Sequence, residues 1–156
     1  MPQLIERAKS TPEAASKTAR FQHQPLDLGN PSIRVIKVFP ELSPQSLIQC
    51  RLIHTQIDIE YRCLSYTWGP PENTHEIEVN GKPYMVRRNL WNFLNVARKK
   101  YPWCLFWIDA LSIDQDNVGE RNHQVRQTGK IYSEATEVIA WLGDDPLHEE
   151  FCGRIV

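Results

Sequence analysis

The sequence predicts an α/β fold in which parallel strands form a sheet covered by helices on both faces. Two nearly continuous apolar runs, WCLFWID (103–109) and EVIAWLG (137–143), have the length and composition of strands buried on both faces. Helical patterns separate these runs from each other and from an earlier strand, YRCLSY (61–66). Strands that alternate with helices through short links are typical of a parallel, three-layer α/β sheet.

The first 59 residues are predicted to form two segments that precede this sheet. Residues 1–30 are rich in Ser, Thr, Pro, Ala, Lys and Gln, which indicates a flexible leader. The alternating runs IRVIKVF (33–39) and LIQCRLIHTQI (47–57) flank a turn-rich segment, a pattern typical of a β-hairpin. We therefore divide the chain into a leader, an N-terminal hairpin (31–59) and a main domain (60–156).

A second hairpin and a helix are predicted between the first and second parallel strands. Asn80 and Gly81 lie between alternating runs in HEIEVNGKPYMV (75–86), and this dipeptide favours a tight hairpin turn. Asn89 is suited to cap the helix that follows. The apolar residues of that helix recur at helical spacing and share one face: Leu90, Phe93, Leu94 and Ala97. Both hairpins are expected to decorate the parallel sheet.

The apolar run that ends at Asp109 changes abruptly into an acidic, amide-rich segment, DALSIDQDN (109–117). Asp116 or Asn117 can cap a helix that runs from there to about Ser133. Four residues of this helix are expected to face inward: Val125, Thr128, Ile131 and Tyr132.

Composition excludes several classes of function. The formal net charge is −1, so no overall field attracts nucleic acid or an anionic membrane. No apolar run approaches the roughly 18 residues that a membrane span requires. The four cysteines form no Cys-x-x-Cys pair and no metal-ligand spacing with histidine, which indicates a reducing, cytoplasmic location and no metal site.

The carboxyl ends of the three predicted strands should meet at one edge of the sheet, where ligands bind in open α/β folds. These ends are SYTWGPP (65–71), DALSIDQDN and GDDPLHEE (143–150). The backbone N–H groups at the helix start near Asn117 can also hold an anion. The candidate ligand-binding residues are Ser65, Tyr66, Trp68, Gly69, Asp109, Asp114, Gln115 and Arg121.

A purely structural explanation of the same polar residues remains open. Asn117 can serve only as a cap, and Glu120 can simply complement the helix dipole. Glu120 and Gln124 are four residues apart, so a surface hydrogen bond would account for both. No nucleophile elbow, P-loop or dinucleotide fingerprint is present. The residues alone therefore predict an α/β domain with an acidic, amide-rich pocket edge.

Three blocks of the sequence closely resemble the fungal heterokaryon incompatibility (HET) domain: YRCLSYTWG, VNGKPYMVRRNL and LFWIDALSIDQDNVGERNHQVRQTGKIYSEATEVIAWLG. Their order and spacing match the family over residues 60–145. The family commonly has Cys and Asn where this chain has Ser112 and Asp114. Asp114 adds a negative charge at the expected pocket mouth and should weaken binding of an anion there.

The resemblance implies a cytoplasmic signalling module of fungal self/non-self recognition and programmed cell death. Such a module is expected to assemble with itself, with a receptor or with another HET-domain protein. HET domains are also distantly similar to Toll/interleukin-1 receptor (TIR) domains, which implies a TIR/flavodoxin-like sheet. A sheet of that kind has further strands, so we expect the domain to be incomplete at its C-terminus, and a truncated, inactive paralogue is one alternative.

Some TIR domains cleave NAD, so the resemblance also implies a second alternative, an NAD glycohydrolase. The catalytic carboxylate would lie on the helix after the third parallel strand, at Glu149 or Glu150, with Glu120 as the fallback. That carboxylate would stabilise an oxocarbenium-like centre while nicotinamide leaves. NAD is then a substrate, and no cofactor is required.

Overall fold

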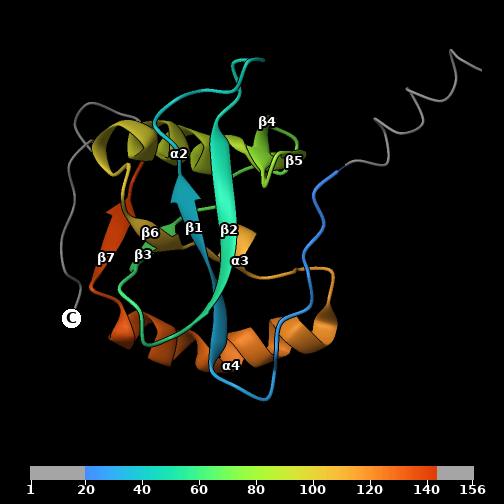
Figure 1. Cartoon of the computed structure of the whole chain (residues 1–156), viewed down its shortest axis with the longest axis vertical. Helices are drawn as coiled ribbons and strands as arrows, with labels where there is room; N and C mark the ends of the chain where they lie inside the picture. Colours follow the sequence, from blue (N-terminus) through green and yellow to red (C-terminus); the bar gives the residue numbers. More distant parts are fainter. Residues whose placement is uncertain (1–19, 144–156) are drawn as a thin grey trace, which may run out of the picture.

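The strands form one mixed sheet in the computed structural model, which describes residues 20–143 (Figure 1). Their order across the sheet is β5-β4-β2-β1-β6-β3-β7. The strands in these residues are β1 (Ser32–Val38), β2 (Gln49–Gln56), β3 (Arg62–Tyr66), β4 (Thr74–Val79), β5 (Lys82–Arg87), β6 (Leu105–Trp107) and β7 (Glu137–Trp141). The helices are α2 (Arg88–Lys100), α3 (Asp109–Ser112) and α4 (Val118–Glu134).

The predicted α/β class is confirmed, but the sheet is mixed and not purely parallel. Strand β3 pairs in parallel with β6 on one side and with β7 on the other, so these three carboxyl ends point the same way. The strand pairs expected to decorate the sheet instead extend it. Strand β1 lies antiparallel between β2 and β6, and β4 pairs with β2 in parallel and with β5 antiparallel.

The central position of β1 follows from its composition. Ile33 and Val35 point to one face and Ile36 and Val38 to the other, and all four are buried. A strand that is apolar on both faces is stable only when both faces are covered, which a decorating hairpin does not achieve. The alternation of this run predicted a decorating hairpin strand, although apolar side chains occur on both of its faces.

Residues 20–30, assigned to the leader, contact the domain. Phe21 and Leu26 are buried, and the Phe21 N–H donates a hydrogen bond to the Pro83 carbonyl oxygen at 3.1 Å. We call residues 20–27 the N-terminal strap. The predictions for residues 1–19 and 144–156 lie outside the described residues.

The two longer helices lie on opposite sides of the strands in Figure 1, and each contributes to a buried cluster. The predicted apolar face of α2 is confirmed, because all four of its residues are buried. The predicted face of α4 is partly wrong. Ile131 is buried, but Val125 is 60% exposed, while the polar residues Glu120 and Gln124 are buried. Helix α4 therefore turns a polar stripe inward at its start.

Helix capping agrees with the prediction at α4 and differs at α2. The Asn117 side chain accepts a hydrogen bond from the Glu120 N–H at 3.1 Å, as an N-cap does. Asn89 lies inside α2, which begins after Arg87. Its side chain donates to the Thr67 carbonyl oxygen and accepts from Trp141 Nε1 at 3.2 Å. Asn89 thus ties α2 to the carboxyl ends of β3 and β7.

The apolar run 103–109 forms a shorter strand than predicted, because turns occupy both of its ends. The Cys104 N–H donates to the Tyr101 carbonyl oxygen at 3.2 Å, and Trp103 is 79% exposed. At the other end, Asp109 begins the single helical turn of α3. This early turn brings the polar segment back across the carboxyl edge of the sheet.

The cysteines that the structure describes belong to the packed interior or its margin. Cys50 and Cys63 are buried, and burial raises the pKa of each thiol to about 12. Both therefore stay protonated and pack as small apolar side chains. Within residues 20–143, no helix combines the length and apolarity that crossing a membrane requires.

Candidate functional site

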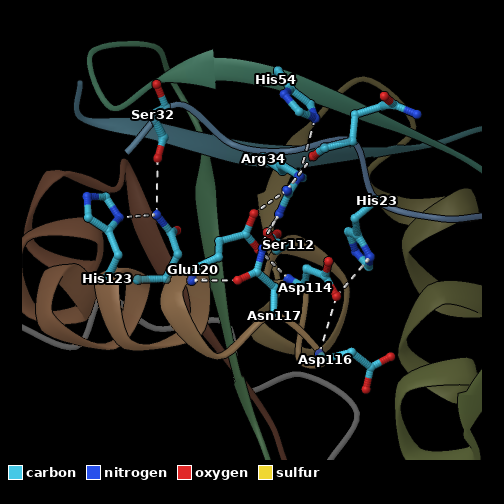
Figure 2. Close-up of polar contacts among 12 residues, drawn as sticks. His23, Ser32, Arg34, His54, Ser112, Asp114, Asp116, Asn117, Glu120 and His123 are labelled. Atoms are coloured by element: carbon cyan, nitrogen blue, oxygen red, sulfur yellow. Dashed lines mark hydrogen bonds and ion pairs between the residues drawn. The ribbon is translucent and has the colours of Figure 1, made fainter. Parts of the chain in front are cut away.

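A buried ion pair between Arg34 of β1 and Glu120 of α4 lies at the centre of the polar contacts in Figure 2. Arg34 is 0% exposed and Glu120 is 1% exposed. Both guanidinium nitrogens of the fork contact the carboxylate, Nη1 to Oε2 at 2.9 Å and Nη2 to Oε1. Such bidentate geometry is the strongest that arginine makes with a carboxylate.

The same arginine connects three further parts of the chain. Nη1 donates to the Ser112 carbonyl oxygen at 3.0 Å, and Nη2 donates to the Gln24 carbonyl oxygen at 2.6 Å. Nε lies 3.3 Å from Nε2 of His54 on β2. Arg34 therefore joins β1 to α3, α4, the N-terminal strap and β2, and all of its donor groups are used.

Glu120 is held as a carboxylate by its partners. Burial opposes ionisation, but the hydrogen bonds from Arg34 and from the Asp114 N–H, together with the charge of Arg34, keep its pKa below the ordinary value. The Asp114 N–H lies 2.7 Å from Oε2. The explanation of Glu120 as a surface residue is therefore wrong. Its position in the interior, with both oxygens occupied, assigns it to holding the polar segment in place.

The polar segment 109–117 is also anchored by the strap and by α4 (Figure 2). His23 Nε2 lies 2.8 Å from the Leu111 carbonyl oxygen, and its Nδ1 lies 3.9 Å from a carboxylate oxygen of Asp114. Gln124, fully buried on α4, donates to the Ser32 carbonyl oxygen at 3.2 Å. The His23 contacts hold the polar segment against the strap, and the Gln124 contact holds α4 against β1.

A cavity of about 150 Å³ lies beside the anchored segment, at the carboxyl end of β3. We call it the carboxyl-edge cavity. Residues from β3 and the segment after it, from β5, from α2 and from the polar segment share its walls, and three of them are aromatic. Its wall residues include Tyr66, Trp68, Tyr84, Arg87, Ala110 and Gln115.

The Trp68 ring is held by charged groups at its edge and on its face. Its Nε1 lies 3.2 Å from both carboxylate oxygens of Asp109. Arg87 lies over the ring, with its guanidinium carbon 5.0 Å from the ring centre, and donates to the Gly69 carbonyl oxygen at 2.9 Å.

Burial raises the pKa of Asp109, although the hydrogen bonds from Trp68 and the Ala110 N–H oppose this rise. Burial and the nearby Asp109 also raise the pKa of Tyr66, which stays protonated.

The structure brings together about half of the ligand-binding residues predicted from the sequence. Tyr66, Trp68 and Gln115 line the cavity, while Asp109 and Gly69 hold its wall in place. The Gln115 amide also donates to the Asp109 carbonyl oxygen at 3.1 Å.

The other predicted residues lie elsewhere. Ser65 points to the opposite side of β3 from Tyr66 and is exposed, and Arg121 is exposed on α4. Asp114 does not line the cavity; its carboxylate accepts from the Asp116 N–H at 3.2 Å. Glu149 and Glu150 lie outside the described residues.

Sequence reasoning missed Tyr84 and Arg87, which enter the cavity from β5, and the buried pair's Arg34. The Asn80–Gly81 turn gave a signal for the strand but none for its place in the sheet. For Arg34 a signal existed, because strand alternation places this charged residue on the same face as the apolar Ile36 and Val38. Such a residue requires a buried partner.

Removing one member of the Arg34–Glu120 pair should destabilise the fold strongly. Arg34→Met leaves a buried carboxylate without a partner, so we expect the free energy of unfolding to fall by about 3–5 kcal/mol. Arg34→Lys keeps the positive charge but loses the bidentate guanidinium, so it should lower the free energy of unfolding by less than Arg34→Met does. Urea denaturation measures the stability of these variants. The single variants Arg34→Met and Glu120→Gln and the double variant that combines them complete a double-mutant cycle. Additive effects of the two substitutions would contradict a direct interaction.

Stability should also fall on acidification in two steps. Burial and the charge of Arg34 lower the pKa of His54 from 6.5, and Glu120 only partly opposes this shift. The unfolded chain therefore takes up a proton at His54 at a higher pH than the folded chain does. Stability is therefore lost as the pH falls below about 6.5. The lowered pKa of Glu120 adds a second loss below about 4.5, because the unfolded chain binds that proton first. Urea denaturation across this pH range measures both losses of stability. The upper loss should be absent in His54→Gln, and the lower loss should be absent in Glu120→Gln.

Comparison with known proteins identifies the family. The family described as "Heterokaryon incompatibility protein (HET)" matches residues 61–154. Heterokaryon incompatibility protein 6, OR allele, of Neurospora crassa is 31% identical over 140 residues, and the alignment covers 79% of this chain but 21% of that protein. No solved structure matches the chain. Its sequence blocks, the extent of the family match and the identity to this relative show that the chain belongs to the heterokaryon incompatibility (HET) family.

Proposed function

We propose that this HET-domain chain is a cytoplasmic signalling module of fungal self/non-self recognition. In this proposal it triggers growth arrest and programmed cell death when incompatible hyphae fuse. It acts by assembling with itself, with a receptor or with another HET-domain protein. The chain spans about a fifth of the length of the Neurospora relative, whose name refers to incompatibility, so its role within a whole protein is part of the proposal.

One observation carries the proposal: the three blocks that resemble the family converge on the carboxyl-edge cavity. The first block contributes Tyr66 and Trp68, and the second contributes Tyr84 and Arg87. The third contributes Ala110 and Gln115. Segments that are far apart in the sequence thus meet in one small space. This convergence supports one shared functional site rather than three unrelated structural motifs.

Expression in a filamentous fungus tests the proposal. We expect inducible expression of the chain to arrest growth and kill cells, and Arg87→Gln to reduce this effect. Arg126→Gln, the same substitution at an exposed position of α4, is the matched control and should act like the unmodified chain. Immunoblots would verify that the variants are present at equal levels. Normal growth at high levels of folded chain, or equal arrest with Arg87→Gln, would contradict the proposal.

A second candidate function, NAD cleavage, is favoured by the place of the cavity in the sheet. After β4 and β5 at the far edge of the sheet, the chain forms β6 on one side of β3 and then crosses to β7 on the other side, so the strand order changes direction at β3. Ligands of open α/β sheets bind at such a point. A TIR/flavodoxin-like sheet shares this feature, and we include that finer fold in the proposal, with Glu149 or Glu150 as the catalytic carboxylate.

Incubating the concentrated 156-residue chain with NAD and measuring released nicotinamide tests this second function. Release that is lost in Glu149→Gln or Glu150→Gln, while the melting temperature is unchanged, would support the proposed carboxylates. Glu120→Gln should affect release only through lower stability, because its carboxylate is engaged by Arg34. The absence of release from chain that melts cooperatively would exclude NAD cleavage and leave the signalling role intact.

A further inference from the structure

We propose that the carboxyl-edge cavity binds one planar aromatic ring that carries a hydrogen-bond acceptor, such as a carboxylate or carboxamide, on its edge. This inference does not rest on the signalling role or on NAD cleavage. It follows from the size of the cavity, the chemistry of its walls and the sign of the charge that lines it.

Size limits the ligand to a single ring. The cavity measures about 150 Å³, whereas sites for drug-sized molecules usually measure about 300–1,000 Å³. A cavity of about 150 Å³ in a protein interior accommodates benzene. A larger ligand would therefore place one ring inside and the rest of the molecule outside.

Three of the wall residues are aromatic. Tyr66, Trp68 and Tyr84 line the cavity, and aromatic faces stack well on a planar ring. Two of these rings are held before any ligand arrives. Asp109 fixes the edge of Trp68, and Phe21 of the strap packs edge-on against Tyr84 with 5.6 Å between ring centres. Binding therefore orders few side chains, which favours affinity.

The charge that lines the cavity selects an acceptor. Arg87 is the charged side chain among the cavity's wall residues, and one of its nitrogens already donates to Gly69. A guanidinium has five N–H donors, so others remain for a ligand. The negative charge of Asp109 lies behind Trp68, where the indole N–H engages both carboxylate oxygens. A ring with a carboxylate should thus bind better than one with a carboxamide, and a ring with an amine should bind worst.

Titration of the 156-residue chain with four probes tests these three properties. The probes are benzoate, benzamide, benzylamine and cyclohexanecarboxylate. Rings of this size should bind in roughly the millimolar range, which ligand-observed NMR measures. We expect benzoate to bind most tightly. Cyclohexanecarboxylate, which has the charge of benzoate without the flat ring, should bind at least several-fold more weakly.

Two variants locate the binding site. Arg87→Gln should weaken benzoate binding about tenfold or more and benzamide binding less, because it removes a charge-assisted hydrogen bond. Arg126→Gln should leave both unchanged. Ala110→Leu fills the cavity and should abolish binding of all rings, and thermal melting would verify that the variant folds.

Each contrary result overturns the inference. Equal binding of benzoate and cyclohexanecarboxylate would exclude selection of a flat ring. Equal binding of benzoate and benzylamine would exclude Arg87 as the selecting group. Binding that persists in folded Ala110→Leu would place the ligand elsewhere, and no binding of any probe at tens of millimolar would exclude a ring site.

Discussion

The buried ion pair between Arg34 and Glu120 is the interaction on which the rest of the structure depends. Neither charge is tolerated in the interior without the other, and breaking such a pair costs about 3–5 kcal/mol out of the roughly 5–15 kcal/mol by which domains are stable. Arg34 lies on the central strand β1, outside the residues 61–154 that match the family. The matched segment by itself would leave Glu120 without its partner and β6 without its antiparallel neighbour, so residues 20–60 form part of the same folding unit.

The ion pair also determines the shape of the cavity. Glu120 accepts from the Asp114 N–H and Arg34 donates to the Ser112 carbonyl oxygen, so the pair holds the polar segment on both sides of Ile113. That segment carries Ala110 and Gln115 into the cavity wall, and its Asp109 orients Trp68. A change in the interior at Arg34 is thus transmitted to the cavity through backbone contacts. The stability of the fold and the position of the cavity wall are therefore coupled through the same ion pair.

Predictions that depend on local pattern agree with the structure, and those that depend on partners from distant segments often do not. The apolar face of α2 and the Asn117 cap each follow from a few neighbouring residues. Asn89 also resembles a cap locally, yet it bridges Thr67 and Trp141, which the sequence does not show to be close. Val125 is apolar and was expected inside. Helix α4 instead turns Glu120 and Gln124 inward, because Arg34 and the Ser32 carbonyl oxygen require polar partners.

The sequence by itself determined the family, the α/β class, the three strands whose carboxyl ends share an edge and three of the residues that line the cavity. These follow from periodicity, turn residues and motif blocks, which are properties of short segments. Only the tertiary structure decided that the expected hairpins extend one mixed sheet, that Arg34 is the partner of Glu120 and that Tyr84 and Arg87 complete the cavity. The physical reason is that strand order and the pairing of buried charges depend on contacts between residues tens of positions apart, for which a single sequence carries no local signal.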